Sequence, residues 1–177
     1  YLRIQNSGVD FFCTASLIKG CKQWHLGNSF KNQYKYQFEG IFRALPRHSD
    51  VLLAIGEIDC RLESGIIANK KKFPEKKMKE IIQTTIENYL AFIVSNNSNC
   101  QHKIVIQGVP CPNIDRRNHS KKDVRELVDM IQNFNWELKR MSNENGFGFL
   151  DVHNLTNRGD GFSNSIWHID RIHLTPE

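Results

Sequence analysis

Two patterns of hydrophobic residues alternate along the chain. Short continuous apolar runs, the pattern of strands buried on both faces, cover residues 9–13, 50–55, 103–109 and 147–152. Apolar residues elsewhere recur every three or four positions, which predicts amphipathic helices over 34–45, 74–94 and 123–143. Alternating strands and helices are typical of α/β proteins, so we expect a three-layer αβα fold with helices on both faces of a doubly wound parallel sheet.

Proline, glycine and capping residues indicate where the helices begin and end. Pro74 suits the first turn of the second helix, Asp123 caps or opens the third, and Gly146 ends it. The chain has no internal repeat, and 177 residues suit one compact domain, so we expect a single domain over 1–177. The start at Tyr1 and the final Thr-Pro-Glu, a typical helix start, lead us to expect truncation at both ends.

Charge and composition narrow the class of protein. Lys and Arg exceed Asp and Glu by 24 to 19, and the excess gathers in two runs, 70–79 and 116–122. The runs lack interleaved aromatic residues, so solvated helix ends and loops are the first interpretation and polyanion or nucleic-acid binding a weaker one. No stretch reaches the roughly 18 apolar residues that span a bilayer. Five cysteines without paired zinc spacing, and no secretory signal, favour a reducing, cytoplasmic location.

The most informative motif lies near the C-terminus, where Asp170 precedes His173 by three residues in a loop. This spacing lets the carboxylate accept a hydrogen bond from one imidazole nitrogen while the other nitrogen faces a substrate. Such a pair can act as a general base. The alternative is a surface histidine beside an aspartate that caps a helix.

Polar residues follow the expected strands at 56–61, 110–119 and 153–173. In a doubly wound sheet, ligands bind outside the carboxyl ends of the strands, so we expect these three loops to meet at one edge. Gly56 comes directly after a buried strand, where its backbone N–H can be aimed at a developing oxyanion.

The order of these features resembles that of the SGNH, or GDSL, hydrolases. The matching blocks are Gly-Glu-Ile-Asp-Cys-Arg at 56–61, Trp-His-Ile-Asp-Arg-Ile-His at 167–173, and Ala-Ser-Leu-Ile-Lys-Gly at 15–20 with a downstream Asn28-Ser29. The resemblance implies a flavodoxin-like fold and a Ser-His-Asp esterase mechanism with no metal and no organic cofactor. It implies a class of reaction and does not define one substrate.

The chain departs from this family at the nucleophile. Family members carry Gly-Asp-Ser after an N-terminal strand, and this chain has no such block. Ser7 stands nearest to the nucleophile's place, and Ser16 is a weaker second candidate. Because few residues separate Ser7 from the run at 9–13, too few for the crossover of about a dozen residues that parallel strands need, we expect the nucleophile block to lie upstream of Tyr1.

The oxyanion donors depart from the family as well. The commonest family form has an Asn where this chain has Ile58, whose side chain cannot donate a hydrogen bond. The oxyanion then falls to the backbone N–H of Gly56, or to Arg61 if its guanidinium reaches the site, and the resemblance implies a second N–H near Thr14. We interpret the charged residues of the central block as substrate-binding groups or as an ion-pair network that fixes the loop; these are Glu57, Asp59 and Arg61.

Aromatic and imidazole groups near the motifs have weaker roles. Trp167 and Trp24 suit packing or substrate stacking. His25, His153 and His168 are alternative bases, each more often a structural histidine, and no ligand spacing supports a metal site.

These observations predict a serine-type ester hydrolase. Acetyl esters of carbohydrates are the preferred substrates, by resemblance alone, and a lipid ester is disfavoured because no apolar lid segment is visible. The alternative is a catalytically inactive SGNH-like module that binds a glycan or a protein partner in the same cleft.

Overall fold

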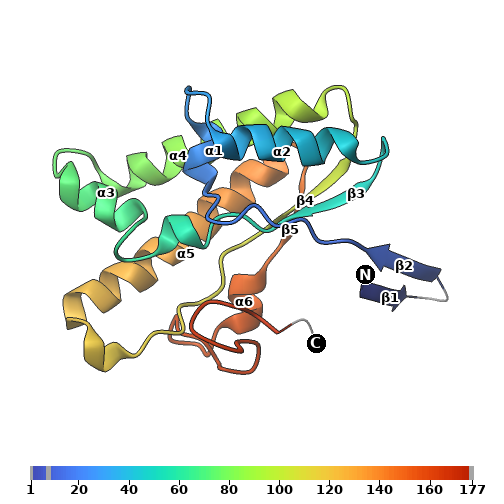
Figure 1. Ribbon diagram of the computed structural model, residues 1–177. Helices are drawn as coiled ribbons and strands as arrows, with labels where there is room; N and C mark the ends of the chain where they lie inside the picture. The colour runs from blue at the N-terminus through green and yellow to red at the C-terminus, as the bar shows by residue number, and fades with distance from the viewer. Residues whose placement is uncertain (1, 7–8, 176–177) are drawn as a thin grey trace.

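A parallel sheet of three strands forms the centre of the molecule (Figure 1). The computed structural model describes residues 2–6 and 9–175. The strands are β3 (Asp50–Leu53), β4 (Lys103–Gln107) and β5 (Gly148–Leu150), in the order β3-β4-β5. Val51 pairs with Ile104 and Ile106 with Phe149, both in parallel register. The predicted α/β character is confirmed, and each strand forms within the apolar run that predicted it.

The described chain contains six α-helices and two short 3-10 helices. They are α1 (Gln23–Gly27), α2 (Gln33–Ala44), η1 (Ile58–Cys60), α3 (Ile66–Lys72), α4 (Met78–Asn97), η2 (Arg116–Asn118), α5 (Lys121–Glu144) and α6 (Val152–Thr156).

Side-chain caps correct two of the predicted helix starts. α5 begins after Ser120, whose hydroxyl accepts the N–H of Asp123, so Ser120 is the capping residue and Asp123 lies within the first turn. α4 begins at Met78 rather than at Pro74, and Glu80 accepts the N–H of the preceding Lys77. Gly146 follows α5 with a φ of 74°, a left-handed conformation that favours glycine, as predicted.

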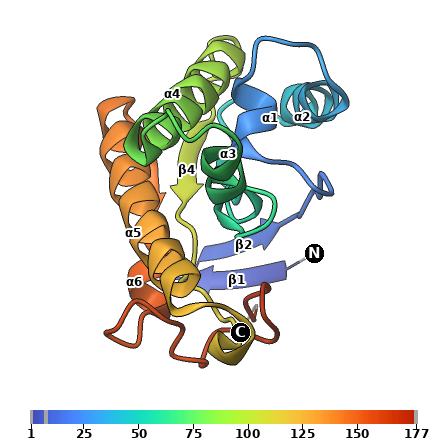
Figure 2. The same cartoon turned by 90° about the vertical axis from the view of Figure 1, so that its left-hand side faces the viewer.

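One face of the sheet carries the hydrophobic core. α4 and α5 pack against each other beside the sheet, with α1 against α4 (Figure 2). Leu53 and Ile106 point from the strands into this core, where they join buried residues of the two long helices; among these are Ile86, Tyr89, Leu90, Ile93, Phe134 and Leu138. Burial of a large apolar side chain contributes about 2 kcal/mol, so these helices are held chiefly by this stripe.

The opposite face of the sheet is open. Leu52, Val105 and Leu150 share it and remain 52%, 36% and 43% exposed. The prediction of helices on both faces is therefore not matched by the described chain, which places its helical cover over the face of Leu53 and Ile106. Continuous apolar runs predicted strands buried on both sides, but a run of this kind does not identify the element that covers each side.

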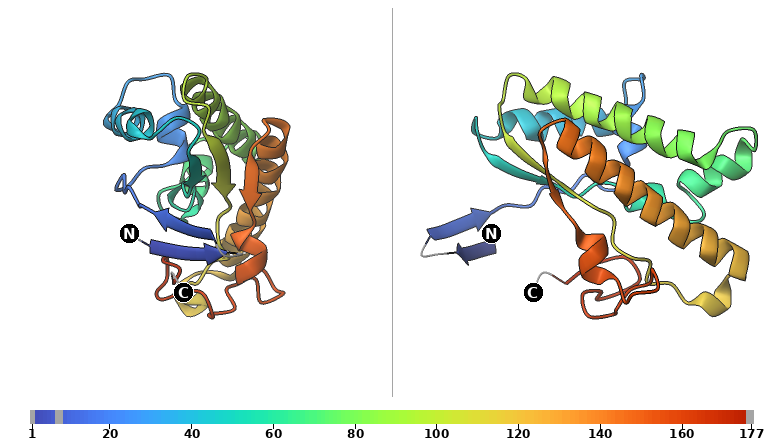
Figure 3. Two further views of the ribbon diagram at one scale, coloured as in Figure 1. Left: turned by 90° about the vertical axis from the view of Figure 1, so that its right-hand side faces the viewer. Right: turned by 180° about the vertical axis from the view of Figure 1, so that it is seen from behind.

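The first strands form a separate hairpin. β1 (Leu2–Asn6) pairs antiparallel with β2 (Val9–Cys13), and the hairpin projects away from the central sheet (Figure 3). The run at 9–13 was predicted as a strand, which is confirmed, but its place in the parallel sheet was predicted wrongly. A short turn suffices for an antiparallel pair, whereas a parallel pair needs a long crossover.

Candidate active site at the strand ends

A cavity of about 260 Å³ lies beyond the carboxyl ends of β3 and β4. The loops after both strands and the C-terminal loop all contribute to its lining, and Figure 1 shows the C-terminal loop beside α6 at this end of the molecule. Its polar lining residues include Glu57, Arg61, Asn113, His168 and Arg171. Its apolar lining residues include Val109, Leu127 and Ile131. The three loops that were expected to meet therefore do so, around what we call the strand-end cavity.

The C-terminal loop is closed by its own backbone. The N–H of Thr175 donates to the carbonyl of Trp167 at 2.7 Å, and the N–H of Ile169 donates to that of His173 at 3.0 Å. A bridge pairs His168 with Leu174 in antiparallel orientation. Residues 169–173 therefore form a tight turn, which we call the tip of the C-terminal loop.

Asp170 and His173 lie at that tip and contact each other. Asp170 Oδ2 and His173 Nδ1 are 2.6 Å apart, and Asp170 Oδ1 accepts the backbone N–H groups of Ile172 and His173, each at 2.7 Å. These hydrogen bonds, that from the imidazole first, hold the pKa of Asp170 well below its usual range. Both side chains are exposed, and Nδ1 is the nitrogen engaged, so Nε2 is left to face solvent. This Asp170–His173 dyad has the geometry of an oriented general base.

The central block combines an ion pair with a buried carboxylate. Nε and Nη2 of Arg61 donate hydrogen bonds to the carboxylate of Glu57, at 2.6 to 3.0 Å, and both residues line the cavity. Asp59 takes no part in that pair: it is 2% exposed and accepts the N–H groups of Gln23 and Trp24, at 2.7 and 3.2 Å. Asp59 therefore holds the first turn of α1 against this loop, while Glu57 and Arg61 fix the loop's cavity side.

Burial raises the pKa of Asp59 to about 6, although the two N–H donors oppose the shift. Burial also raises the pKa of the Cys21 thiol, to about 12, and the nearby Asp59 contributes to this shift. This corner of the molecule is thus a low-dielectric environment.

Gly56, the expected oxyanion donor, is packed behind the cavity wall. Its φ is 148°, and an added Cβ would lie 3.1 Å from Gln23 Nε2 and 3.2 Å from Val109 Cγ2. The lining of the strand-end cavity begins one residue later, at Glu57. Only a residue without a side chain fits this place, and the same position brings the start of the loop close to the core.

The remaining predicted residues lie in the N-terminal segment and at the base of the C-terminal loop. Thr14 and Ser16 are exposed in the irregular segment between β2 and α1. Ser7, the first candidate for the nucleophile, lies outside the described residues. Trp167 is half-buried at the base of the C-terminal loop, where its carbonyl closes the loop.

Three other histidines have distinct surroundings. His25 Nδ1 accepts the N–H of Lys22, and its ring stacks on Tyr34 with 3.9 Å between the ring centroids. His25 therefore stabilises the start of α1 and its packing on α2. His153 Nε2 is buried without a partner among the described residues, and burial lowers the pKa of His153. His168 lines the cavity and contacts Ser163. In residues 2–6 and 9–175, no three His, Cys, Asp or Glu side chains gather closely enough to hold a metal ion.

Buried polar side chains that the sequence did not single out fix the cavity wall after β4. Asn135 accepts the N–H of Val109 at 2.7 Å and donates to the carbonyl of the same residue at 2.9 Å. Thr156 Oγ1 accepts the N–H of Cys111 at 2.9 Å. A polar residue on an otherwise apolar helix face is the signal that marks Asn135 in the sequence.

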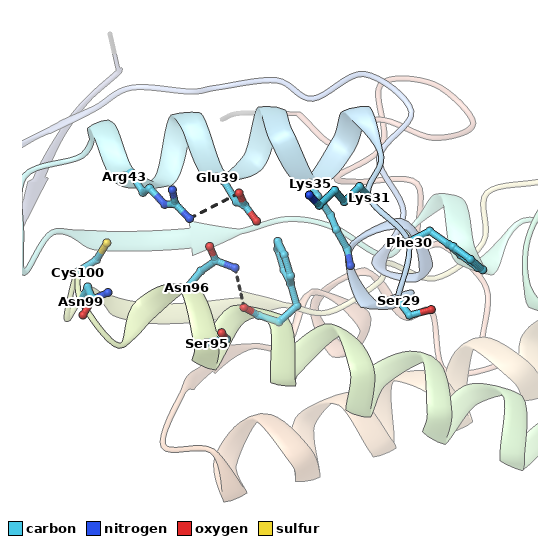
Figure 4. A pocket seen from close by; sticks show the side chains of 11 residues that line it. Ser29, Phe30, Lys31, Lys35, Glu39, Arg43, Ser95, Asn96, Asn99 and Cys100 are labelled. Atoms are coloured by element: carbon cyan, nitrogen blue, oxygen red, sulfur yellow. Dashed lines mark hydrogen bonds and ion pairs between the residues drawn. The ribbon is translucent and has the colours of Figure 1, made fainter.

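A larger groove of about 720 Å³ lies between α2 and α4 (Figure 4). Lys35 and Arg43 line it from α2, with Lys35 Nζ 5.3 Å from the centre of the Phe92 ring and Arg43 paired with Glu39 at 3.6 Å. The amide of Asn96 donates to the Phe92 carbonyl on the α4 side. Among the described residues that line this groove there is no histidine or aspartate, so we place the candidate chemistry at the smaller cavity.

The two basic runs are partly engaged in local contacts. Lys71 pairs with Asp123 at 3.0 Å, Lys70 Nζ donates to the carbonyl of Pro74, and Arg117 pairs with Asp115 at 2.9 Å.

Within the described ranges, every helix is too short or too polar to cross a membrane. No protein-family model matches the chain, and no curated protein matches it significantly.

Proposed function

We propose that this protein is a serine-type ester hydrolase of the SGNH class with a flavodoxin-like sheet. The observation that carries the proposal is the 2.6 Å contact of Asp170 with His173 in a loop that also lines the strand-end cavity. The parallel order β3-β4-β5 and the loops that converge at the carboxyl ends of β3 and β4 support the fold part of the proposal.

The dyad performs the proton transfers of the proposed reaction. Nε2 of His173 takes the proton of a serine hydroxyl as that oxygen attacks the ester carbonyl, and it returns the proton to the leaving alcohol. Asp170 keeps the proton of the neutral ring on Nδ1 and stabilises the imidazolium that forms. Water then attacks the acyl-enzyme in the same sequence and releases the acid.

The cavity favours a small acyl group. Its volume of about 260 Å³ and its apolar lining residues suit a short acyl chain, and its polar lining residues suit a hydrophilic alcohol. Acetyl esters of carbohydrates remain the proposed substrates, on the resemblance of the motifs.

The nucleophile is to be identified by labelling. The protein is treated with a fluorophosphonate, which reacts with a serine activated by a neighbouring base, and the modified peptide is found by mass spectrometry. Labelling of Ser7 or Ser16 that His173→Ala abolishes identifies the nucleophile and supports the proposal. Hydrolysis of p-nitrophenyl acetate that His173→Ala does not reduce overturns it.

The alternative is an inactive module that uses the same cavity to hold a glycan or a protein partner. The observation that favours it is that Ser16, the candidate serine within the described residues, is not among those that line the cavity. Binding of an acetylated sugar without turnover or labelling supports this alternative.

A further inference from the structure

A second imidazole lies at the strand-end cavity, and its environment differs from that of His173. His168 lines the cavity, and its Nδ1 is 2.7 Å from the hydroxyl of Ser163. Ser163 is 4% exposed, so its hydroxyl hydrogen must find an acceptor within the protein. Nδ1 of His168 lies within hydrogen-bonding distance and can accept this hydrogen.

The hydrogen bonds around Ser163 determine the tautomer of His168. Ser163 Oγ already accepts the N–H of Ser165 at 2.9 Å, and the hydroxyl then donates its own hydrogen to Nδ1. A ring that accepts at Nδ1 carries its proton on Nε2. Partial burial lowers the pKa of His168, which keeps the ring neutral near pH 7. Nε2–H has no partner among the described residues.

Backbone hydrogen bonds hold both Ser163 and His168 in place and so fix the position of this ring. The N–H of Ser163 donates to the carbonyl of Pro112 at 3.1 Å, and the N–H of Asn164 donates to the carbonyl of Thr156 at 2.8 Å. His168 itself pairs with Leu174 in the backbone bridge that closes the C-terminal loop. The imidazole is thus a preorganised N–H donor, which is the requirement for stabilising charge that develops during a reaction.

We propose that His168 Nε2–H donates a hydrogen bond to the carbonyl oxygen of the ester, and to its oxyanion, in the strand-end cavity, with Ser163 as the positioning residue. The inference rests on the proposed function and gives the cavity the side-chain donor that Ile58 cannot supply. Arg171 also lines the cavity, but its exposed side chain interacts with Asp115 only at longer range, and no hydrogen bond or close ion pair among the described residues holds it in one place.

The tautomer is tested without any turnover. In nitrogen-15 NMR at pH 7, His168 of the wild-type protein is expected to be neutral and protonated at Nε2, and Ser163→Ala is expected to shift it toward a mixture of tautomers. Ser163→Thr, which keeps the hydroxyl, restores the wild-type signal. A charged ring, or a ring protonated at Nδ1, overturns the inference.

Sodium acetate is the probe for ligand contact in the same spectra. Its carboxylate oxygens accept hydrogen bonds as the ester carbonyl does, so its addition is expected to shift the His168 Nε2–H resonance. A resonance that does not move with acetate overturns the inference. This measurement remains decisive if the protein hydrolyses no ester, a result that overturns the proposed function alone.

Kinetics on p-nitrophenyl acetate give the catalytic test. His168→Phe is expected to lower kcat by about 10² to 10³-fold with little change in KM, the usual effect of losing one oxyanion donor. His168→Gln, whose amide nitrogen replaces Nε2–H, is expected to retain most of the activity. His48→Asn, on the surface, is the matched control. Equal kcat values for His168→Phe and the wild-type protein overturn the inference.

Discussion

The side-chain amide of Asn113 donates to the backbone carbonyl of Asp170 at 2.8 Å, across 57 residues of sequence. This hydrogen bond joins the loop after β4 to the tip that carries the dyad, so it sets where His173 stands relative to the strand-end cavity.

Asn113→Ala is expected to lower kcat for p-nitrophenyl acetate by about 10 to 100-fold, because small displacements of the proposed base, His173, are costly. The free energy of unfolding falls by no more than about 1 kcal/mol, since the hydrogen bond is exposed. Urea denaturation and steady-state kinetics check the two values. Asn118→Ala, in η2, is the control, and equal losses in the two variants would contradict the assignment.

Asp170→Asn is expected to reduce kcat by about 10³ to 10⁴-fold without unfolding the protein. An amide in this place no longer stabilises the imidazolium and allows the wrong tautomer of His173. Circular dichroism checks the fold and steady-state kinetics the rate. The surface variant Asp129→Asn serves for comparison, and wild-type kcat in Asp170→Asn would rule the dyad out as the base.

The buried carboxylate of Asp59 makes stability depend on pH. Its pKa is raised from 3.8 to about 6 in the folded protein, so the folded state binds the proton more tightly than the unfolded state. The stabilisation is complete below pH 3.8 and is lost as the pH rises through about 6. The free energy of unfolding is therefore expected to fall across this window by up to about 3 kcal/mol from this group.

The measurement compares urea denaturation of the wild-type protein and Asp59→Asn between about pH 4 and pH 7, the window in which this carboxyl titrates. The difference between the two free energies of unfolding should change across the window, because the amide of the variant cannot ionise. Parallel profiles for the two proteins would show that Asp59 does not titrate there.

Gly65 tests the packing of the central block. A Cβ there would lie 1.9 Å from the carbonyl oxygen of Asp59, so Gly65→Ala forces the backbone apart and is expected to destabilise by about 3 kcal/mol. Gly40, within α2, has no atom within 4 Å of its added Cβ, and Gly40→Ala is expected to stabilise by up to about 1 kcal/mol. Thermal denaturation compares both, and a harmless Gly65→Ala would mean that the loop lies elsewhere.

The cysteines should differ in their reaction with iodoacetamide. Cys13 is exposed, whereas Cys21, Cys60 and Cys111 are buried and their thiol pKa values are raised by that burial. Cys13 is expected to react first in the native protein, and these three only after denaturation. Mass spectrometry of the native and denatured protein gives the order, and early modification of Cys60 would contradict the packing of η1.

The sequence predicted the elements that a single hydrophobic period defines. The helix expected over 34–45 forms at Gln33–Ala44, and the strands β3, β4 and β5 form within their apolar runs. α3 was missed, since seven residues with three lysines at the end give too short a pattern. The pairing of β2 was also missed, because a strand's partner is decided by contacts outside its own sequence.

The candidate site was predictable where its contacts are local. Asp170 and His173 lie three residues apart, and the expected contact forms. Asp59 was grouped with its neighbours Glu57 and Arg61, but its partners Gln23 and Trp24 are some 36 residues away. Long-range hydrogen bonds of this kind leave no periodic signal, so a structure was needed to find them.

The self-closure of the C-terminal loop has a thermal consequence. Two backbone hydrogen bonds, from Thr175 and from Ile169, close a segment whose tip is exposed and lies outside the main core. Because its tip lies outside the main core, this segment can open as a local unit while α4 and α5 stay packed. On gentle heating, the proposed ester hydrolysis is therefore expected to decline reversibly at temperatures where the helical signal is still complete.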